Sequence, residues 1–236
     1  MTDLVIPGYQ RDPGDTHPPL ASVGYRSTIQ RAPSQPLVLL PHTLTEITGP
    51  VLGEGRVGEL DHDLTRQHAD EPIGERIIVH GQVRDSDGRA VPDTLVELWQ
   101  ANSAGRYAHA RDQHPAPLDP NFTGVGRCLT DSLGRYRFVT IKPGAYPWRN
   151  HENAWRATHL HLSLFGRAFV QRLVTQMYFP GDPLFYQDPI WGAVPEHARG
   201  RMVSAFDLSE TVPEWALAYR FDIVLRGRGA TPMEES

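Results

Sequence analysis

Hydrophobic and polar positions alternate in short runs over most of the chain from residue 74 onward, a pattern typical of β-strands. Residues 85–88 and 131–134 read Asp-Ser-Asp-Gly and Asp-Ser-Leu-Gly, which are turn sequences between such runs. Each turn therefore joins either a hairpin or a pair of sandwich strands. The predicted strands cover residues 76–83, 94–99, 126–130, 136–141, 158–165, 170–179 and 217–225.

The even spacing of these strands favours an all-β fold, an antiparallel β-sandwich with few short helices. Only residues 196–206 have a helical pattern, and residues 45–68 are mixed, with short helical or loop pieces expected around Asp61, His62 and Asp63. Residues 1–35 are rich in proline and lack periodicity. They predict an extended N-terminal arm that wraps a neighbouring subunit, followed by one sandwich domain over residues 36–236.

The composition narrows the possible chemistry. The 236 residues include one cysteine, Cys128, which excludes an intrachain disulfide, a four-thiolate zinc site and an iron–sulfur cluster held by this chain alone. The formal charge of −5 gives no reason to expect nucleic acid or an anionic membrane as a partner. Residues 1–20 have no signal-peptide pattern, and no apolar run has the length of a membrane span, so we expect a soluble, cytoplasmic protein.

The segment that carries most information about chemistry is residues 158–164, Thr-His-Leu-His-Leu-Ser-Leu. Side chains alternate faces along a strand, so the three leucines point to the core and His159 and His161 to the opposite face. The Cα atoms of the two histidines then lie roughly 7 Å apart, which lets both imidazoles bind one metal. The alternative is a pair of half-exposed histidines on an outer sheet face.

The neighbouring sequence does not contain the usual third ligand of such a site. Position 165 is Phe165, the next carboxylate is Asp182 and the next histidine is His197, so the spacings of cupin-type and carbonic-anhydrase-like sites are missing. Without thiolates or a nearby carboxylate, tyrosine is the remaining hard ligand. Tyr107 and Tyr146 lie in loop sequences before the histidines, although a loop tyrosine taken alone is usually structural.

Longer motifs surround these residues, among them Leu-Val-Glu-Leu-Trp-Gln-Ala-Asn at 95–102, Gly-Arg-Tyr at 105–107 and Trp-Arg-Ala-Thr-His-Leu-His at 155–161. With further stretches at 72–79, 118–131, 141–150 and 217–227, the chain resembles the intradiol ring-cleaving dioxygenases from about residue 36 to 227. It departs modestly from that family at Ala145, Ala157 and Thr158, and residues 186–215 match weakly. None of these departures touches a candidate ligand.

The resemblance implies one non-haem Fe(III) per chain, held by Tyr107, Tyr146, His159, His161 and a hydroxide. A free tyrosine has a pKa of about 10, so keeping one ionised at neutral pH costs about 4 kcal/mol, which a trivalent cation supplies. Two phenolates and one hydroxide balance the charge of the ferric ion, so the buried site carries little net charge. The family assigns to Tyr146 the role of the ligand that leaves and accepts a substrate proton.

The resemblance also implies residues around the substrate. Arg156 is the guanidinium that the family places beside the reacting ring, where it stabilises developing negative charge; the alternative is a surface arginine. Gln176 is similar to a polar residue near the oxygen site. Trp148 and Tyr25 resemble walls of the substrate pocket, although Trp148 could equally belong to the core and Tyr25 lies in the less regular arm.

The implied reaction opens an aromatic ring between two hydroxyl-bearing carbons, and both atoms of O2 enter a cis,cis-muconate product. We expect 3,4-dihydroxybenzoate as the substrate and 3-carboxy-cis,cis-muconate as the product, because Tyr25, followed by Arg26, matches an arm position that contacts a ring carboxylate. The implied assembly is a hetero-oligomer with a homologous α chain.

Three alternatives compete with this interpretation. A sandwich that only binds ligands through exposed aromatic and imidazole side chains would hold no iron. A non-catalytic α chain of the family would lack the ligand set, which is complete here. A related intradiol enzyme acting on catechol or hydroxyquinol would carry a long helical N-terminal linker, whereas residues 1–35 are too rich in proline for a helix.

Overall fold

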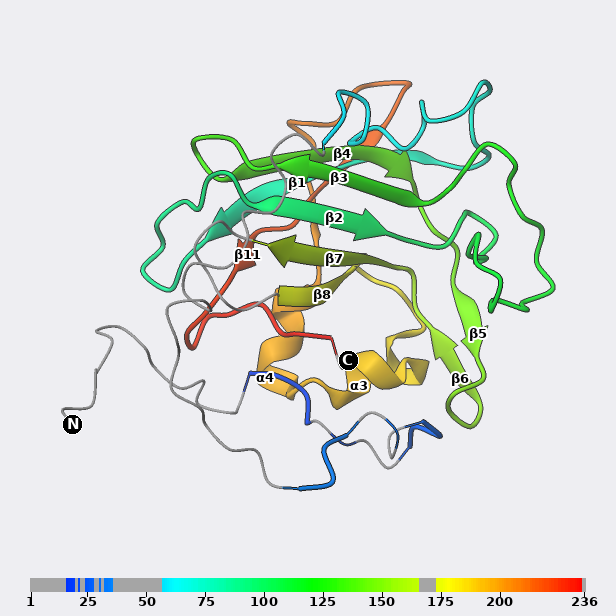
Figure 1. Cartoon of the computed structure of the whole chain (residues 1–236), viewed down its shortest axis with the longest axis vertical. Helices are drawn as coiled ribbons and strands as arrows, with labels where there is room; N and C mark the ends of the chain where they lie inside the picture. Colours follow the sequence, from blue (N-terminus) through cyan, green and yellow to red (C-terminus); the bar gives the residue numbers. More distant parts are fainter. Residues whose placement is uncertain are drawn as a thin grey trace.

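The computed structural model describes residues 16–19, 21, 24–27, 30, 32–35, 57–165 and 173–234. Two large sheets and a small third one make up the fold (Figure 1). One large sheet contains β1 (Arg76–Arg84), β4 (Arg135–Ile141), β9 (Ala205–Phe206), β10 (Leu217–Arg220) and β11 (Ile223–Val224). The other contains β2 (Leu95–Trp99), β3 (Val125–Leu129), β7 (His159–Phe165) and β8 (Leu173–Tyr178). The small sheet pairs β5 (Tyr146–Trp148) with β6 (Ala154–Arg156).

Side chains from the facing sides of the two large sheets meet in one buried core. Leu160, Leu162 and Leu164 of β7 share this core with Ile77 of β1 and Phe138 of β4, and all five are fully buried. Burying each large apolar side chain contributes about 1.5–3 kcal/mol, so this layer holds the sheets together. The predicted antiparallel β-sandwich is confirmed, with one difference: β1 pairs in parallel with both β10 and β11.

The two predicted turns connect the sheets with each other. β1 and β2 lie in different sheets, and so do β3 and β4, so each turn joins two sandwich strands. Across the first turn, hairpin-like pairing is limited to one antiparallel bridge between Arg84 and Ala90. Gly134 closes the second turn with a φ of +71°, and a Cβ at this position would lie 2.7 Å from the carbonyl oxygen of Val83. Only glycine fits both the backbone conformation and the close approach.

The predicted strand over residues 217–225 is interrupted. β10 and then β11 pair with successive parts of β1. Between them, Phe221 turns inward and donates its backbone N–H to the carbonyl oxygen of His80 over 2.8 Å. The first residues of the predicted strand 170–179, up to residue 172, lie outside the described residues. From residue 57 to 75 the chain consists of turns and bends with one bridge, between Asp63 and Val139.

The helix predicted over residues 196–206 is too long. It is observed as α4 (Glu196–Arg199) followed by the 3-10 turn η2 (Gly200–Met202), because Ser204 bonds to the backbone of β8 and residues 205–206 form β9. Two further elements were not predicted, η1 (Phe185–Gln187) and α3 (Pro189–Ala193). Asp188 caps α3, and Pro189 occupies its first turn, a start signal that is present in the sequence.

Part of the predicted N-terminal arm, residues 25–27, lies against this chain's own domain. The backbone N–H of Arg26 donates to the carbonyl oxygen of Asn150 over 2.8 Å, and the Asn150 amide donates to the Ser27 hydroxyl over 2.8 Å. This contact places Tyr25 next to the loop that follows β5. Within the described residues, no helix combines the length and the apolar character needed to cross a membrane.

Candidate metal centre

The alternation predicted for β7 is observed. Leu160, Leu162 and Leu164 lie in the core, while His159 and His161 face the other side of the sheet. Neither histidine is on an open surface: His159 is 2% exposed, and the side chain of His161 is 12% exposed. The ring of Trp99 on the neighbouring strand stacks on His161 at a centroid distance of 4.8 Å. The interpretation as half-exposed surface histidines is therefore wrong.

Four donor atoms from three segments of the chain converge in this place. The Nε2 atoms of His159 and His161 are 3.2 Å apart, and the Tyr107 hydroxyl lies 3.1 Å from Nε2 of His161. The Tyr146 hydroxyl, from β5, lies 3.5 Å from that of Tyr107. The structure thus brings together the four residues that the sequence analysis singled out as ligands.

The contacts behind the two imidazoles determine which nitrogen faces the centre. Nδ1 of His159 lies 2.6 Å from the carbonyl oxygen of Ala157, and Nδ1 of His161 lies 2.7 Å from a carboxylate oxygen of Glu234. Both partners accept hydrogen bonds, so each Nδ1 carries the proton. In the neutral imidazoles the two Nε2 lone pairs then point at each other, an arrangement that a cation between them would satisfy.

Burial sets the protonation of these groups. It raises the pKa of Tyr107 well above the usual value, and it raises the pKa of Tyr146, where the Arg156 charge offsets part of the effect. Burial and then the Arg156 charge lower the pKa of His159 well below its usual value. The imidazole is therefore neutral, ready to bind a metal, and the phenols ionise only when a cation compensates them.

The donor set suits a hard, trivalent ion. Within the described part of the chain, no group of three or more His, Cys, Asp or Glu is placed to hold a metal, so tyrosine oxygens must complete any site at these histidines. Two phenolates and two neutral imidazoles form such a set, and phenolates favour Fe(III) over a divalent ion. The residues present fit a ferric ion.

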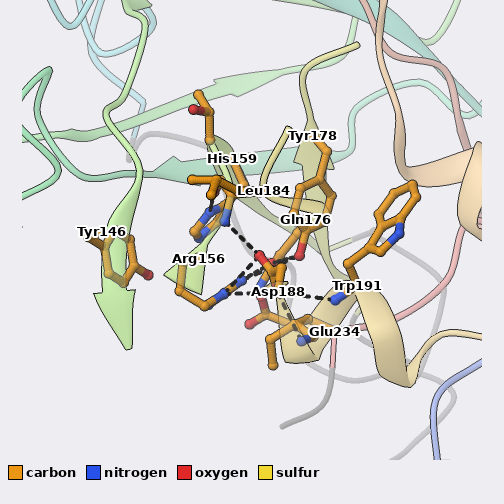
Figure 2. A network of polar contacts seen from close by, with 12 residues as sticks. Tyr146, Arg156, His159, Gln176, Tyr178, Leu184, Asp188, Trp191 and Glu234 are labelled. Atoms are coloured by element: carbon orange, nitrogen blue, oxygen red, sulfur yellow. Dashed lines mark hydrogen bonds and ion pairs between the residues drawn. The ribbon is translucent and has the colours of Figure 1, made fainter. Parts of the chain in front are cut away.

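Arg156, at the end of β6, is the centre of a buried polar network (Figure 2). Its Nε lies 3.1 Å and 3.2 Å from the two carboxylate oxygens of Asp188, and its Nη2 donates to the amide oxygen of Gln176. The Tyr178 hydroxyl donates to the same amide oxygen over 2.7 Å. Arg156 is 4% exposed, so the interpretation as a surface arginine is wrong.

A pocket of about 360 Å³ opens beside the two tyrosines. Its lining includes Tyr107, Tyr146 and Trp148 but not His159 or His161, so the two tyrosines face the pocket and these two histidines lie behind them. The Arg156 guanidinium lies 5.5 Å from the centre of the Trp148 ring, and the Tyr25 ring meets Trp148 edge-on at 5.0 Å. Tyr25 is buried behind Trp148 and does not line the pocket itself.

Comparison with known proteins agrees with this geometry. A family profile described as "Dioxygenase" matches residues 47–227, and a second profile, "Protocatechuate 3,4-dioxygenase beta subunit N terminal", matches residues 9–43. The protocatechuate 3,4-dioxygenase beta chain of Burkholderia cepacia is 58% identical over 221 residues, which are 93% of this chain and 94% of the relative.

The chain belongs to the intradiol dioxygenase family.

One further relative and one solved structure are similar to this intradiol dioxygenase. The protocatechuate 3,4-dioxygenase alpha chain of Pseudomonas putida is 31% identical over 206 residues, covering 83% of this chain and 97% of the relative. The chlorocatechol 1,2-dioxygenase of Rhodococcus opacus 1CP has the same fold, with a TM-score of 0.54 at 23% identity over 75% of this chain and 70% of that chain. The higher identity to a beta chain argues against the α-chain alternative, and family membership argues against a sandwich that only binds ligands.

Sequence reasoning missed three residues of the intradiol dioxygenase site. Asp188 holds Arg156, Tyr178 contacts Gln176, and Glu234 contacts both His161 and Gln176. Tyr178 lies directly opposite His159 on β8, a relation visible only once the strand register is known. Glu234 is ionised: burial alone would raise its pKa, but the His161 ring and the Gln176 amide outweigh that and lower it.

We expect Asp188→Asn to destabilise this intradiol dioxygenase by about 3–5 kcal/mol, because a buried ion pair loses one charge and leaves Arg156 uncompensated. The asparagine oxygen can still cap Ile190 and Trp191. The asparagine nitrogen cannot accept from the Ala157 N–H, which donates to the other carboxylate oxygen over 2.9 Å, so the loss includes this hydrogen bond. Urea unfolding measures the difference. Asp87→Asn is the control, because Asp87 and Arg89 form an exposed pair. Equal effects of the two substitutions would contradict a stabilising role of the buried pair.

Proposed function

We propose that Tyr107, Tyr146, His159 and His161 bind one ferric ion and that the chain, with this ion, cleaves 3,4-dihydroxybenzoate with O2 to 3-carboxy-cis,cis-muconate. The observation that carries the proposal is the convergence of two phenol oxygens and two imidazole nitrogens, with neighbouring donor atoms 3.1–3.5 Å apart. When bound, a ferric ion supplies the Lewis acidity that makes a chelated catechol ring reactive toward O2.

Tyr146 accepts a proton from the substrate in this proposal. A catechol that binds through both oxygens must lose two protons. A phenolate at the pocket is a suitable acceptor for one of them, and the hydroxide of the expected ligand set would accept the other. Tyr146 lines the pocket, and burial raises its pKa while the positive charge of Arg156, the next largest effect, offsets part of that increase. In Figure 2 its hydroxyl points toward the side where Arg156 and His159 lie.

Arg156 and Gln176 stabilise charge at the reacting ring. Arg156 keeps a full positive charge in a buried position, because Asp188 lies against it and its pKa is well above the usual value despite the opposing effect of burial. Tyr146 and Arg156 are directly opposite each other in the β5–β6 pair, so this charge lies next to the ligand that exchanges with substrate. A fixed charge in a dry site acts more strongly than one in water.

Two arginines at the pocket support a substrate with a ring carboxylate. Arg111 and Arg149 both line it, are exposed, and form no ion pair among the described residues. A carboxylate without a partner in a buried pocket would cost several kcal/mol, so a site for 3,4-dihydroxybenzoate needs such cations. We place Trp148 at the wall of this pocket and Tyr25 behind it, where Tyr25 holds Trp148 in position.

We also infer that the chain assembles with a homologous α chain and that residues 1–35 form an arm on a sandwich domain of residues 36–236. Relatives named beta chain and alpha chain both match most of this sequence, which supports two homologous subunits in one enzyme. Several large apolar side chains between residues 206 and 217 are exposed, which an interface would cover. They are Phe206, Leu208, Val212, Trp215 and Leu217.

The purified protein should contain ferric iron and show a broad visible band, because phenolate-to-iron charge transfer absorbs there and zinc would not. His159→Ala and His161→Ala should abolish iron retention, measured by metal analysis. Tyr146→Phe should keep some iron and colour through Tyr107 and lower kcat by about 100-fold or more, since it removes the proton acceptor. Tyr186→Phe is the control, because Tyr186 is 97% exposed. A folded, assembled protein without colour and iron would refute the site.

The native enzyme should prefer 3,4-dihydroxybenzoate over catechol in kcat/KM. Arg149→Gln should lower this constant for 3,4-dihydroxybenzoate about 10-fold and hardly change it for catechol, because only the former carries a carboxylate. Tyr25→Phe should have a smaller effect in the same direction, and Arg89→Gln, on an exposed turn, should have none. If the enzyme turns over catechol or hydroxyquinol as well as 3,4-dihydroxybenzoate, the substrate assignment is wrong. The proposed iron site would not be affected by that result.

Co-expression with an α chain should give a stable hetero-oligomer, detected by size-exclusion chromatography with light scattering, because an arm rich in proline and exposed apolar side chains need a neighbour to cover them. The chain expressed alone should aggregate or be poorly active. A monodisperse and fully active protein without the α chain would show that this partner is not needed.

A further inference from the structure

Residues 230–234 connect the two large sheets at the edge of the metal centre. Thr231 exchanges two hydrogen bonds with Val224 of β11, its N–H donating over 2.9 Å and its hydroxyl accepting over 3.0 Å. The Thr175 hydroxyl of β8 donates to the carbonyl oxygen of Pro232 over 2.6 Å. The N–H of Glu234 donates to the carbonyl oxygen of Val174 over 2.8 Å, which holds this end of the chain beside β8 (Figure 1).

This anchored backbone directs the Glu234 carboxylate into the site. One oxygen, Oε2, accepts from Nδ1 of His161 over 2.7 Å and from the amide nitrogen of Gln176 over 2.8 Å. The Glu234 side chain is 14% exposed. His161 and Gln176 face each other across β7 and β8, so a single oxygen from a third segment joins two residues of neighbouring strands.

The contact makes the two histidines unequal. Nδ1 of His159 donates to a backbone carbonyl, whereas Nδ1 of His161 donates to a carboxylate. A carboxylate partner fixes the tautomer and increases the basicity of the opposite nitrogen more than a carbonyl does. The contact therefore holds the His161 Nε2 lone pair toward Tyr107 and strengthens it as a ligand.

The same carboxylate orients Gln176. Because the amide nitrogen of Gln176 donates to Glu234, its amide oxygen faces the other way, toward Arg156 and Tyr178, which both donate to it. The reversed amide would place two donors against the guanidinium. Glu234 thereby links His161 of the metal centre to the network around Arg156.

We propose that Glu234 is a positioning residue of the iron centre, which holds His161 and Gln176 through one carboxylate oxygen and makes residues 230–234 part of the functional site. The inference rests on the proposed iron site and extends it to a residue outside the predicted ligand set. Its role is to orient and strengthen ligands, and it touches neither substrate nor iron.

The test compares Glu234→Ala, Glu234→Gln and the native protein in the full assembly. Glu234→Ala should release iron to a chelator about 10–100-fold faster, because outer contacts of metal-binding histidines contribute by that factor. It should also shift the visible band, since the His161 ligand becomes a weaker donor. Glu234→Gln keeps an acceptor oxygen without the charge, so its rate of iron release should lie between those of the native protein and Glu234→Ala. Glu210→Gln, the same change at an exposed glutamate, is the control and should match the native protein.

The outcomes separate the claims. A native protein without iron would overturn the proposed function and this inference together. A native protein that holds iron, with Glu234→Ala releasing it equally slowly and with an unchanged band, would overturn this inference alone. If Glu234→Ala fails to fold, the isosteric Glu234→Gln takes its place in the test. If Glu234→Gln then releases iron at the native rate and has the native visible band, the proposal is overturned. A purely structural role would lower the melting temperature of the iron-free protein while leaving the band of bound iron unchanged, and that result also overturns it.

Discussion

Four polar donor atoms buried around one point are the constraint on which the rest of this site depends. The Nε2 atoms of His159 and His161 face each other 3.2 Å apart, each with its proton on the far side of the ring. Two buried hydroxyls lie next to them. Without a cation the Tyr107 hydroxyl can donate to Nε2 of His161, but among the described residues only the Nε2 lone pair of His161 faces that of His159. A bound cation would satisfy both lone pairs at once and so stabilise the arrangement.

The positive charge of Arg156 favours the deprotonated forms that such a cation binds, whereas the Glu234 carboxylate raises the pKa of Tyr107 and the Asp188 carboxylate that of Tyr146. Arg156 acts on two kinds of ligand at once: its charge lowers the pKa of His159, and it offsets part of the increase that burial causes for Tyr146. Asp188 and Glu234 lie on the other side of the network, so the one buried guanidinium is compensated by carboxylates. The site is thus prepared for a highly charged ion without a large uncompensated charge of its own.

The position of the pocket gives the two pairs of ligands different tasks. Tyr107 and Tyr146 line it, whereas the histidines lie on a central strand of the sheet behind them. His159 and His161 are held by the register of β7 with its neighbours and by the leucine core on the opposite face. Tyr146 belongs to a three-residue strand of the small sheet, so the ligand that the proposed reaction displaces comes from the less constrained segment.

The sequence by itself determined the sandwich, because strand alternation and turn residues are local properties. It also singled out His159 and His161, because the alternating leucines of the same strand assign these histidines to the face opposite the core. It also carried the start signal of α3 at Asp188 and Pro189. Only the tertiary structure decided that Asp188 pairs with Arg156 and that Glu234 contacts His161. These partners are 32 and 73 residues apart in the sequence. They meet because of the register of β7 with β8 and the path of residues 230–234. The length of α4 was also decided by tertiary structure, through the contact between Ser204 and β8. A short helix is ended by packing rather than by helix propensity.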